Sequence, residues 1–208
     1  MRRTITALSL VSALVLALVS TMAAAPALAQ DAGGLSMGTP VAPDGGQIGT
    51  PYAKEEHGAW TVRCVRTETG RDPCQLYQLL KDANGDGVAE IVVFPLLPPQ
   101  GDAVAGGNVM TPLETLLTQQ LTLSIDGGEA RRYPFMYCNQ AGCMVRMGFA
   151  VADLDKLRGG TTANVAIVPM VAPDQRVELA ISLDGFTAGY AAVSEIMDAL
   201  VQQSASGN

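Results

Sequence analysis

The sequence predicts an all-β domain, a sandwich or barrel-like fold of about eight short strands. Segments of alternating apolar and polar residues recur along the chain, and turn signals separate them about every 8 to 12 residues. The chain has 208 residues, with 22 glycines, 12 prolines and only 16% charged residues. This composition is typical of many turns and short elements, so we expect one domain rather than several.

Residues 1–29 have the pattern of a secretory signal peptide. Arg2 and Arg3 precede a long Ala/Leu/Val run, and Ala27-Leu28-Ala29 places small residues before a cleavage site. An uncleaved membrane anchor is the alternative, because the run from Ala7 to Ala25 is long enough to span a bilayer. The small residues at the cleavage site favour cleavage. We expect no transmembrane segment in the chain that remains once the signal peptide is removed.

Three further segments are expected after the signal peptide. Residues 30–54 are rich in glycine, proline and small polar residues, which is typical of a flexible linker. A single β domain is expected over residues 55–202. The polar residues 203–208 are predicted to be a disordered tail.

The strands of this domain follow from period-two alternation. In the first of them, Trp60, Val62 and Cys64 share one face. The expected strands are 59–65, 74–80, 87–96, 121–126, 130–138, 143–149, 164–172 and 176–183. Acidic residues early and basic residues late predict a short helix near 152–158, and apolar residues at helical spacing predict a C-terminal amphipathic helix.

The segment 96–120 is less regular. Two prolines and a glycine pair favour a loop in its first half. In its second half, Thr111 as N-cap, Pro112 at the first helical position and Glu114 three residues after the cap predict a short helix. An extended conformation is the alternative, since the leucines here also suit the edge of a sheet.

The loop between the second and third predicted strands has two interpretations. Asp82, Asn84 and Asp86 fit the first positions of a calcium loop, but position 12, where calcium loops carry glutamate, is Val93. Asn84-Gly85 is a strong hairpin signal, because both residue types tolerate positive φ. A hairpin turn is the favoured interpretation and a weak calcium site the alternative.

The four cysteines of an exported chain predict two disulfides. Local spacing favours Cys64 with Cys74 and Cys138 with Cys143, the second closing a turn in which Gly142 can adopt unusual backbone angles. A zinc site is a weaker alternative because the two spacings differ and the chain has one histidine. A redox pair is the other weaker alternative, because it would need C-x-x-C at a helix N-terminus, and Cys138 and Cys143 have four residues between them and strands on either side.

No catalytic, cofactor-binding or metal-binding set is predicted. His57 is expected at the surface, and the pairs Glu55-Glu56 and Asp153/Asp155 in exposed or capping positions. Arg131-Arg132 is expected to be a solvated strand end rather than an anion site. The net charge of −7 makes nucleic acid an improbable partner.

Several motifs together resemble one protein family. They are "HGAWTVRCV", "DPCQLYQ", "RRYPFMYCNQAGCMV", "DLDKLRGG" and "ISLDGFTAGYAAV", over about residues 57–193. The most specific parts are W-x-V-x-C, C-x4-C with glycine before its second cysteine, and S-L-x-G-F. The chain resembles the invasion-associated locus B family, and departs from it in the long stretch 96–120.

The resemblance implies an exported β protein of the periplasm or outer envelope, of alphaproteobacterial type, without a catalytic residue. Some members of that family are linked to entry into host cells. Trp60, Gly142, Phe186 and the cysteines carry over as structural positions. We therefore expect a non-enzymatic envelope protein whose β-sandwich surface binds another envelope or external protein. The alternative is a periplasmic hydrolase with a carboxylate site that the sequence does not reveal.

Overall fold

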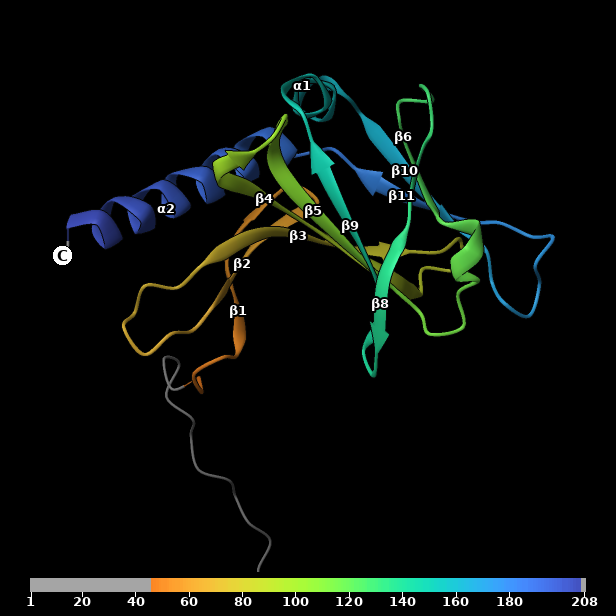
Figure 1. The fold of residues 1–208 in the computed structure, drawn as a ribbon, viewed down its shortest axis with the longest axis horizontal. Coiled ribbons are helices and arrows are strands. Elements are labelled where there is room, and N and C mark those ends of the chain that lie inside the picture. Colours follow the sequence, from red (N-terminus) through yellow and green to blue (C-terminus); the bar gives the residue numbers. More distant parts are fainter. Residues whose placement is uncertain (1–45, 207–208) are drawn as a thin grey trace, which may run out of the picture. The chain divides into compact units, whose positions relative to one another are not determined.

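The computed structural model describes residues 46–206, which lie in one compact unit. The predicted signal peptide (1–29), the linker residues 30–45 and the last two residues of the predicted tail lie outside the described residues. Within residues 46–206, eleven strands form two antiparallel sheets, accompanied by two α-helices (Figure 1). The all-β fold class with a short helix and a C-terminal helix is therefore confirmed.

The larger sheet has seven strands in the order β1-β2-β3-β4-β5-β9-β8. Their bounds are β1 Pro51–His57, β2 Trp60–Val65, β3 Cys74–Lys81, β4 Gly87–Gln100, β5 Ala103–Thr111, β8 Phe135–Asn139 and β9 Gly142–Phe149. Burial alternates along the central strands, as the sequence pattern predicts. One face of this sheet is therefore the wall of the core.

The smaller sheet has four strands in the order β11-β10-β6-β7. Their bounds are β6 Leu121–Ile125, β7 Arg131–Tyr133, β10 Thr162–Ile167 and β11 Val177–Ser182. Only Pro134 separates β7 from β8, which belongs to the larger sheet. Proline has no N–H to donate to a ladder, so the predicted single strand 130–138 divides here and the chain crosses between the sheets.

The helices cover the core beside the smaller sheet. Helix α1, Val151–Gly159, contacts β5 and β9, and helix α2, Phe186–Ser206, contacts β2, β3 and β4. The buried residues of α2 all lie in its first turns, and its last turns extend away from the strands (Figure 1). In the described part of the chain, no helix is long and apolar enough to cross a membrane.

The loop predicted in the first half of 96–120 is wrong, because residues 103–111 form β5 in the middle of the larger sheet. Gly106 and Gly107, taken as turn residues, leave space for aromatic rings on the two faces of the strand. A Cβ on Gly106 would lie 2.5 Å from the Phe94 ring, and one on Gly107 would lie 2.6 Å from the Phe149 ring. The glycine pair is a packing feature of a strand rather than a loop signal.

The short helix predicted at 111–117 is also wrong. Thr111 ends β5, and the next helical element is the 3-10 helix η1, Leu117–Gln119. Residues 113–114 form a turn, and Thr115 pairs with Pro169 after β10. Beside this bridge the N–H of Leu116 donates to Val168 O at 2.7 Å, and the N–H of Met170 donates to Glu114 O at 2.7 Å. Tertiary hydrogen bonds therefore override the local helix signal.

Both ends of the domain extend further than the sequence pattern predicts. Strand β1 begins at Pro51, inside the predicted linker, because its backbone pairs with β2 although most of its side chains are exposed. Helix α2 continues to Ser206, four residues into the predicted tail. Neither extension buries a clear apolar stripe, so hydrophobic periodicity gives no signal for them.

A hairpin joins β3 to β4, but its loop is longer than the two-residue turn suggested by Asn84-Gly85. Lys81 pairs with Gly87, and the loop between them is organised by the Asp82 carboxylate, which accepts N–H bonds from Asn84 at 2.9 Å and Asp86 at 3.0 Å. These bonds hold the pKa of Asp82 below its usual value. Among residues 46–206, no group of three or more His, Cys, Asp or Glu could hold a metal ion.

Two disulfides connect neighbouring strands of the larger sheet. Cys64 on β2 is bonded to Cys74 on β3, and Cys138 on β8 is bonded to Cys143 on β9. In each case the two cysteines lie directly opposite each other in the strand register. Both bonds therefore reinforce pairings that the sheet already makes.

Replacing Gly107 by alanine should lower the free energy of unfolding by about 1–3 kcal/mol, because the new methyl group overlaps the buried Phe149 ring. Urea denaturation followed by Trp60 fluorescence measures the change. Gly159→Ala is the matched control, since a Cβ at Gly159 meets nothing within 4 Å. Equal stability of the two variants would contradict the packing role of Gly107.

Candidate binding site at the junction of the two sheets

Strand β7 sends its side chains to two opposite sides of the smaller sheet. Side chains alternate along a strand, so Arg131 and Tyr133 share one face and Arg132 occupies the other. Arg131 and Tyr133 line a hollow between the two sheets, whereas Arg132 lines a separate hollow. The adjacent arginines of the sequence therefore belong to two different sites.

The hollow between the sheets has a volume of about 120 Å³. It lies where β6, β7 and the following loop meet β9 and α1. Its lining residues are Leu123, Ser124, Ile125, Gly128, Glu129, Arg131, Tyr133, Phe149, Asp153 and Lys156. Buried leucine and phenylalanine side chains thus lie beside both acidic and basic groups. Burial raises the pKa of the Tyr133 hydroxyl, so that tyrosine is neutral and able to donate a hydrogen bond.

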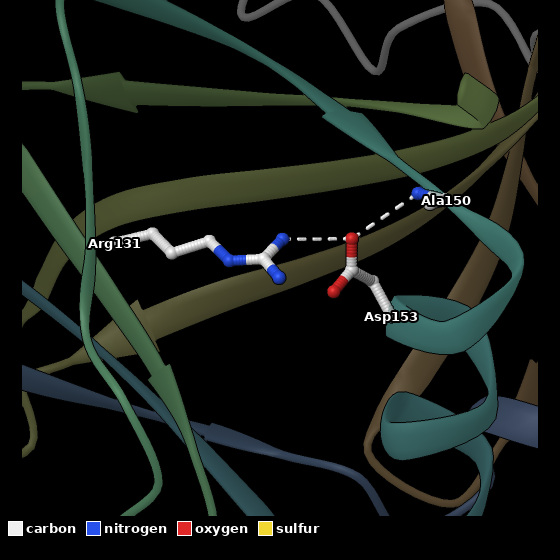
Figure 2. Close-up of polar contacts among 3 residues, drawn as sticks. All are labelled: Arg131, Ala150 and Asp153. Carbon is white, nitrogen blue, oxygen red and sulfur yellow. Dashed lines mark hydrogen bonds and ion pairs between the residues drawn. The ribbon is translucent and has the colours of Figure 1, made fainter. Parts of the chain in front are cut away.

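An ion pair closes one side of this pocket. The Nη1 of Arg131 lies 2.8 Å from the Oδ2 of Asp153, which also accepts the backbone N–H of Ala150 at 3.2 Å (Figure 2). The Asp153 side chain is 9% exposed and that of Arg131 is 54% exposed. Hydrogen bonding to this carboxylate, together with its charge, raises the pKa of Arg131.

Asp153 also determines where helix α1 begins. Ala150 is the N-cap residue and offers no side-chain acceptor, so the carboxylate three residues later reaches back to the free N–H. A negative charge in the first turn is favourable near the positive end of the helix dipole. Asp153 therefore links the start of α1 to β7. Because α1 directly follows β9, this contact also connects the larger sheet to the smaller one.

The residues predicted as structural positions lie away from this pocket. Trp60 is buried and its Nε1 donates to Ser182 O at 2.7 Å, while the Phe186 ring meets its ring edge at a centroid distance of 5.4 Å. Gly142 has φ 144°, and a Cβ there would overlap the carbonyl oxygen of Thr111. None of these residues, nor any cysteine, lines the pocket.

His57 is less exposed than the sequence suggests. Its side chain is 23% exposed at the end of β1, with Nε2 3.5 Å from Glu55 Oε2. Neither residue lines the pocket between the sheets. Asp155, the other predicted carboxylate, is exposed and faces Arg158 at 3.5 Å, so the structure separates it from Asp153.

Comparison with known proteins gives the family. The sequence pattern of the invasion associated locus B (IalB) protein matches residues 60–194, more than half of the chain. The chain belongs to the IalB family. The matched region includes β2 and β3, which carry Cys64 and Cys74. It also includes the pocket between the sheets and the start of α2.

Relatives of this IalB family chain include invasion protein B homologs from two strains of Brucella abortus. Each is 26% identical over 140 residues, which cover 67% of this chain and 78% of the relative. The crystal structure of invasion associated protein B from Bartonella henselae has the same fold, with a TM-score of 0.57 and 23% identity. It matches 69% of this chain and 96% of that one.

Sequence reasoning noticed Arg131 and Asp153 but did not bring them together. They are 22 residues apart and lie on different elements, so no local spacing predicts their contact. The available signal was alternation in the Arg-Arg-Tyr strand, which assigns the two arginines to different faces. The pocket's other side chains come from elements whose approach only the tertiary fold determines.

The Asp153→Ala substitution should lower the free energy of unfolding by about 1–2 kcal/mol, because it removes the bond to the Ala150 N–H and an ion pair whose arginine is half exposed. Asp153→Asn should have a smaller effect, since its amide oxygen can still accept the Ala150 N–H. Urea denaturation measures both. The control is Asp155→Asn, which removes the exposed ion pair with Arg158 and should lower the free energy of unfolding by about 0.5 kcal/mol or less. A similar loss of stability in all three variants would contradict this role of Asp153.

The Asp126→Asn substitution should weaken the pH dependence of stability. The Asp126 carboxylate accepts the N–H groups of Thr161 and Thr162, each at 3.0 Å, and these bonds lower its pKa. A carboxyl group with a lowered pKa stabilises the fold above its usual pKa, and this stabilisation is lost as pH falls through the lowered value.

Urea midpoints of the wild-type protein and the Asp126→Asn variant should therefore converge as the pH falls from about 5 to about 2. The control is Asp102→Asn, in the exposed turn between β4 and β5, whose difference from the wild type should change less over the same range. A constant difference between the wild type and Asp126→Asn at all pH values would contradict the assignment.

Proposed function

We propose that this IalB family protein is exported to the cell envelope and binds another envelope or external protein without catalysing a reaction. Three observations support export: the signal-peptide pattern of residues 1–29, the two disulfides, and the names of its relatives as invasion proteins. Disulfides persist in oxidising compartments such as the periplasm and the cell surface.

The pocket between the two sheets carries the binding proposal. Its volume of about 120 Å³ is smaller than the 300–1,000 Å³ of typical small-molecule pockets, and it suits one side chain of a partner better than a whole metabolite. Protein interfaces are commonly dominated by a few side chains that fill such pockets. The leucine, isoleucine and phenylalanine side chains of this pocket would contact the apolar part of an anchor residue.

The charged residues of the pocket support recognition rather than acid–base chemistry. Asp153 is held by Arg131 and by a backbone N–H, so its carboxylate has a structural task. Glu129 and Lys156 are exposed and make no ion pair among the described residues. They can select a partner by charge at the edge of the pocket. Nothing in the described residues or in the relatives supports the hydrolase alternative.

Pull-down of the tagged protein from intact, crosslinked envelopes tests this proposal. We expect the protein in the envelope fraction and a reproducible partner. Glu129→Lys and Lys156→Glu, which each reverse a charge at the edge of the pocket, should each reduce recovery of that partner about tenfold. Lys54→Glu is the control, because Lys54 is on β1 and does not line the pocket.

Three outcomes would contradict the proposal. A protein found in the cytoplasmic fraction would refute export. The absence of any reproducible partner would refute binding. Equal recovery with the pocket variants and with Lys54→Glu would show that the partner binds elsewhere.

A further inference from the structure

A second hollow lies on the other face of the smaller sheet, and neither the family nor the proposed partner pocket accounts for it. Its volume is about 200 Å³. It is lined by side chains of β6, β7, β10, η1 and the loop before β11. Its polar members are Gln119, Gln120, Thr122, Arg132, Asp174, Gln175 and Arg176. Polar groups from η1, β6, β7 and the loop before β11 therefore meet at one concave surface.

Two exposed arginines of this hollow make no ion pair among the described residues. Arg132 on β7 lies directly opposite Thr122 on β6, and the Nη2 of Arg176 donates to the Thr122 hydroxyl at 2.7 Å. Among residues 46–206, neither arginine has a carboxylate oxygen within 4 Å, which is also true of Arg66, Arg71 and Arg146, but only Arg132 and Arg176 line the same hollow. The hollow therefore holds two guanidinium groups, neither in an ion pair among the described residues, and one carboxylate, Asp174, so that its lining carries a net positive charge in a chain of net charge −7.

The backbone supports a functional role for the same hollow. Gln120 has φ 58° and ψ 163°, a region that residues other than glycine rarely occupy. The surrounding structure maintains this conformation: the N–H of Gln120 donates to Leu117 O at 3.1 Å, and the next residue is already buried in β6. Strained side-chain-bearing residues of this kind concentrate at binding sites.

We propose that this hollow binds a phosphate group carried on a sugar. Arg132 and Arg176 supply the donors and the charge that a phosphate dianion requires. The glutamine amides donate and accept hydrogen bonds, as sugar hydroxyls do. Asp174, at the exposed edge of the hollow, repels the phosphate group of either ligand, but a sugar hydroxyl that donates to its carboxylate offsets this repulsion for the sugar phosphate alone. This combination distinguishes a sugar phosphate from an inorganic ion.

Isothermal titration of the purified protein with glucose 6-phosphate, inorganic phosphate and glucose tests the proposal. Glucose 6-phosphate should bind most tightly, inorganic phosphate more weakly and glucose not measurably. Arg132→Gln and Arg176→Gln should each weaken glucose 6-phosphate binding about tenfold or more. Arg146→Gln is the matched control, because Arg146 is an exposed arginine on β9 of the larger sheet and lines neither hollow.

Two further variants test individual parts of the site. Asp174→Asn should tighten the binding of inorganic phosphate, since it removes a like charge from the hollow. Gln120→Gly should raise the thermal midpoint by relieving the backbone and at the same time weaken glucose 6-phosphate binding. Gly70→Ala, at φ 68° in an exposed turn, should by contrast lower the midpoint and leave binding unchanged.

The outcomes separate the parts of the proposal. No binding of glucose 6-phosphate, or equal affinity in Arg132→Gln and Arg146→Gln, would overturn it. Inorganic phosphate binding as tightly as glucose 6-phosphate would overturn the sugar component. Because Arg132 and Arg176 do not line the pocket between the sheets, these measurements are independent of the pull-down with the pocket variants.

Discussion

The carbonyl oxygen of Ser182, at the end of β11, is the point where the two sheets are bound together inside the core. It accepts the Nε1 of Trp60 at 2.7 Å and the Nε2 of Gln78 at 2.9 Å, both from the larger sheet, and the N–H of Ser182 donates to Gln78 Oε1 at 2.9 Å. Buried amide and indole groups require such partners, because an unpaired one costs free energy. Helix α2 begins four residues later, and its Phe186 packs on the Trp60 ring.

The chain also joins the sheets at Pro134, where β7 gives way to β8 without a loop. The two connections determine where concave surfaces can form. The Arg131–Asp153 pair links β7 to α1 beside the pocket between the sheets, and Arg132 lines the opposite hollow. Three consecutive residues of one short strand thus line two hollows, while both arginines remain exposed, as expected of a solvated strand end.

The parts of the fold that were predictable from the sequence are those in which local pattern and burial agree. Trp60, Val62 and Cys64 alternate in the sequence and are all buried in β2, and the acidic and basic ends of α1 follow the helix dipole. Strand β5 was missed because Gly106 and Gly107 serve the rings of Phe94 and Phe149, which are distant in sequence. The pockets were missed for the same reason: their residues converge through pairings such as Thr122 with Arg132, and no local period encodes those.

The Cys138–Cys143 bond also limits the exchange of strands between copies of the chain. Strand β8 is the last strand of the larger sheet, and its exposed Met136 and Tyr137 lie beside a free backbone edge. Such edges pair with strands of other molecules, and a hairpin that opens can exchange its strand with a second copy. The bond fixes β8 to β9 covalently, so this exchange is closed to the oxidised protein. Formation of this bond would then protect the chain from domain swapping as well as stabilise its fold.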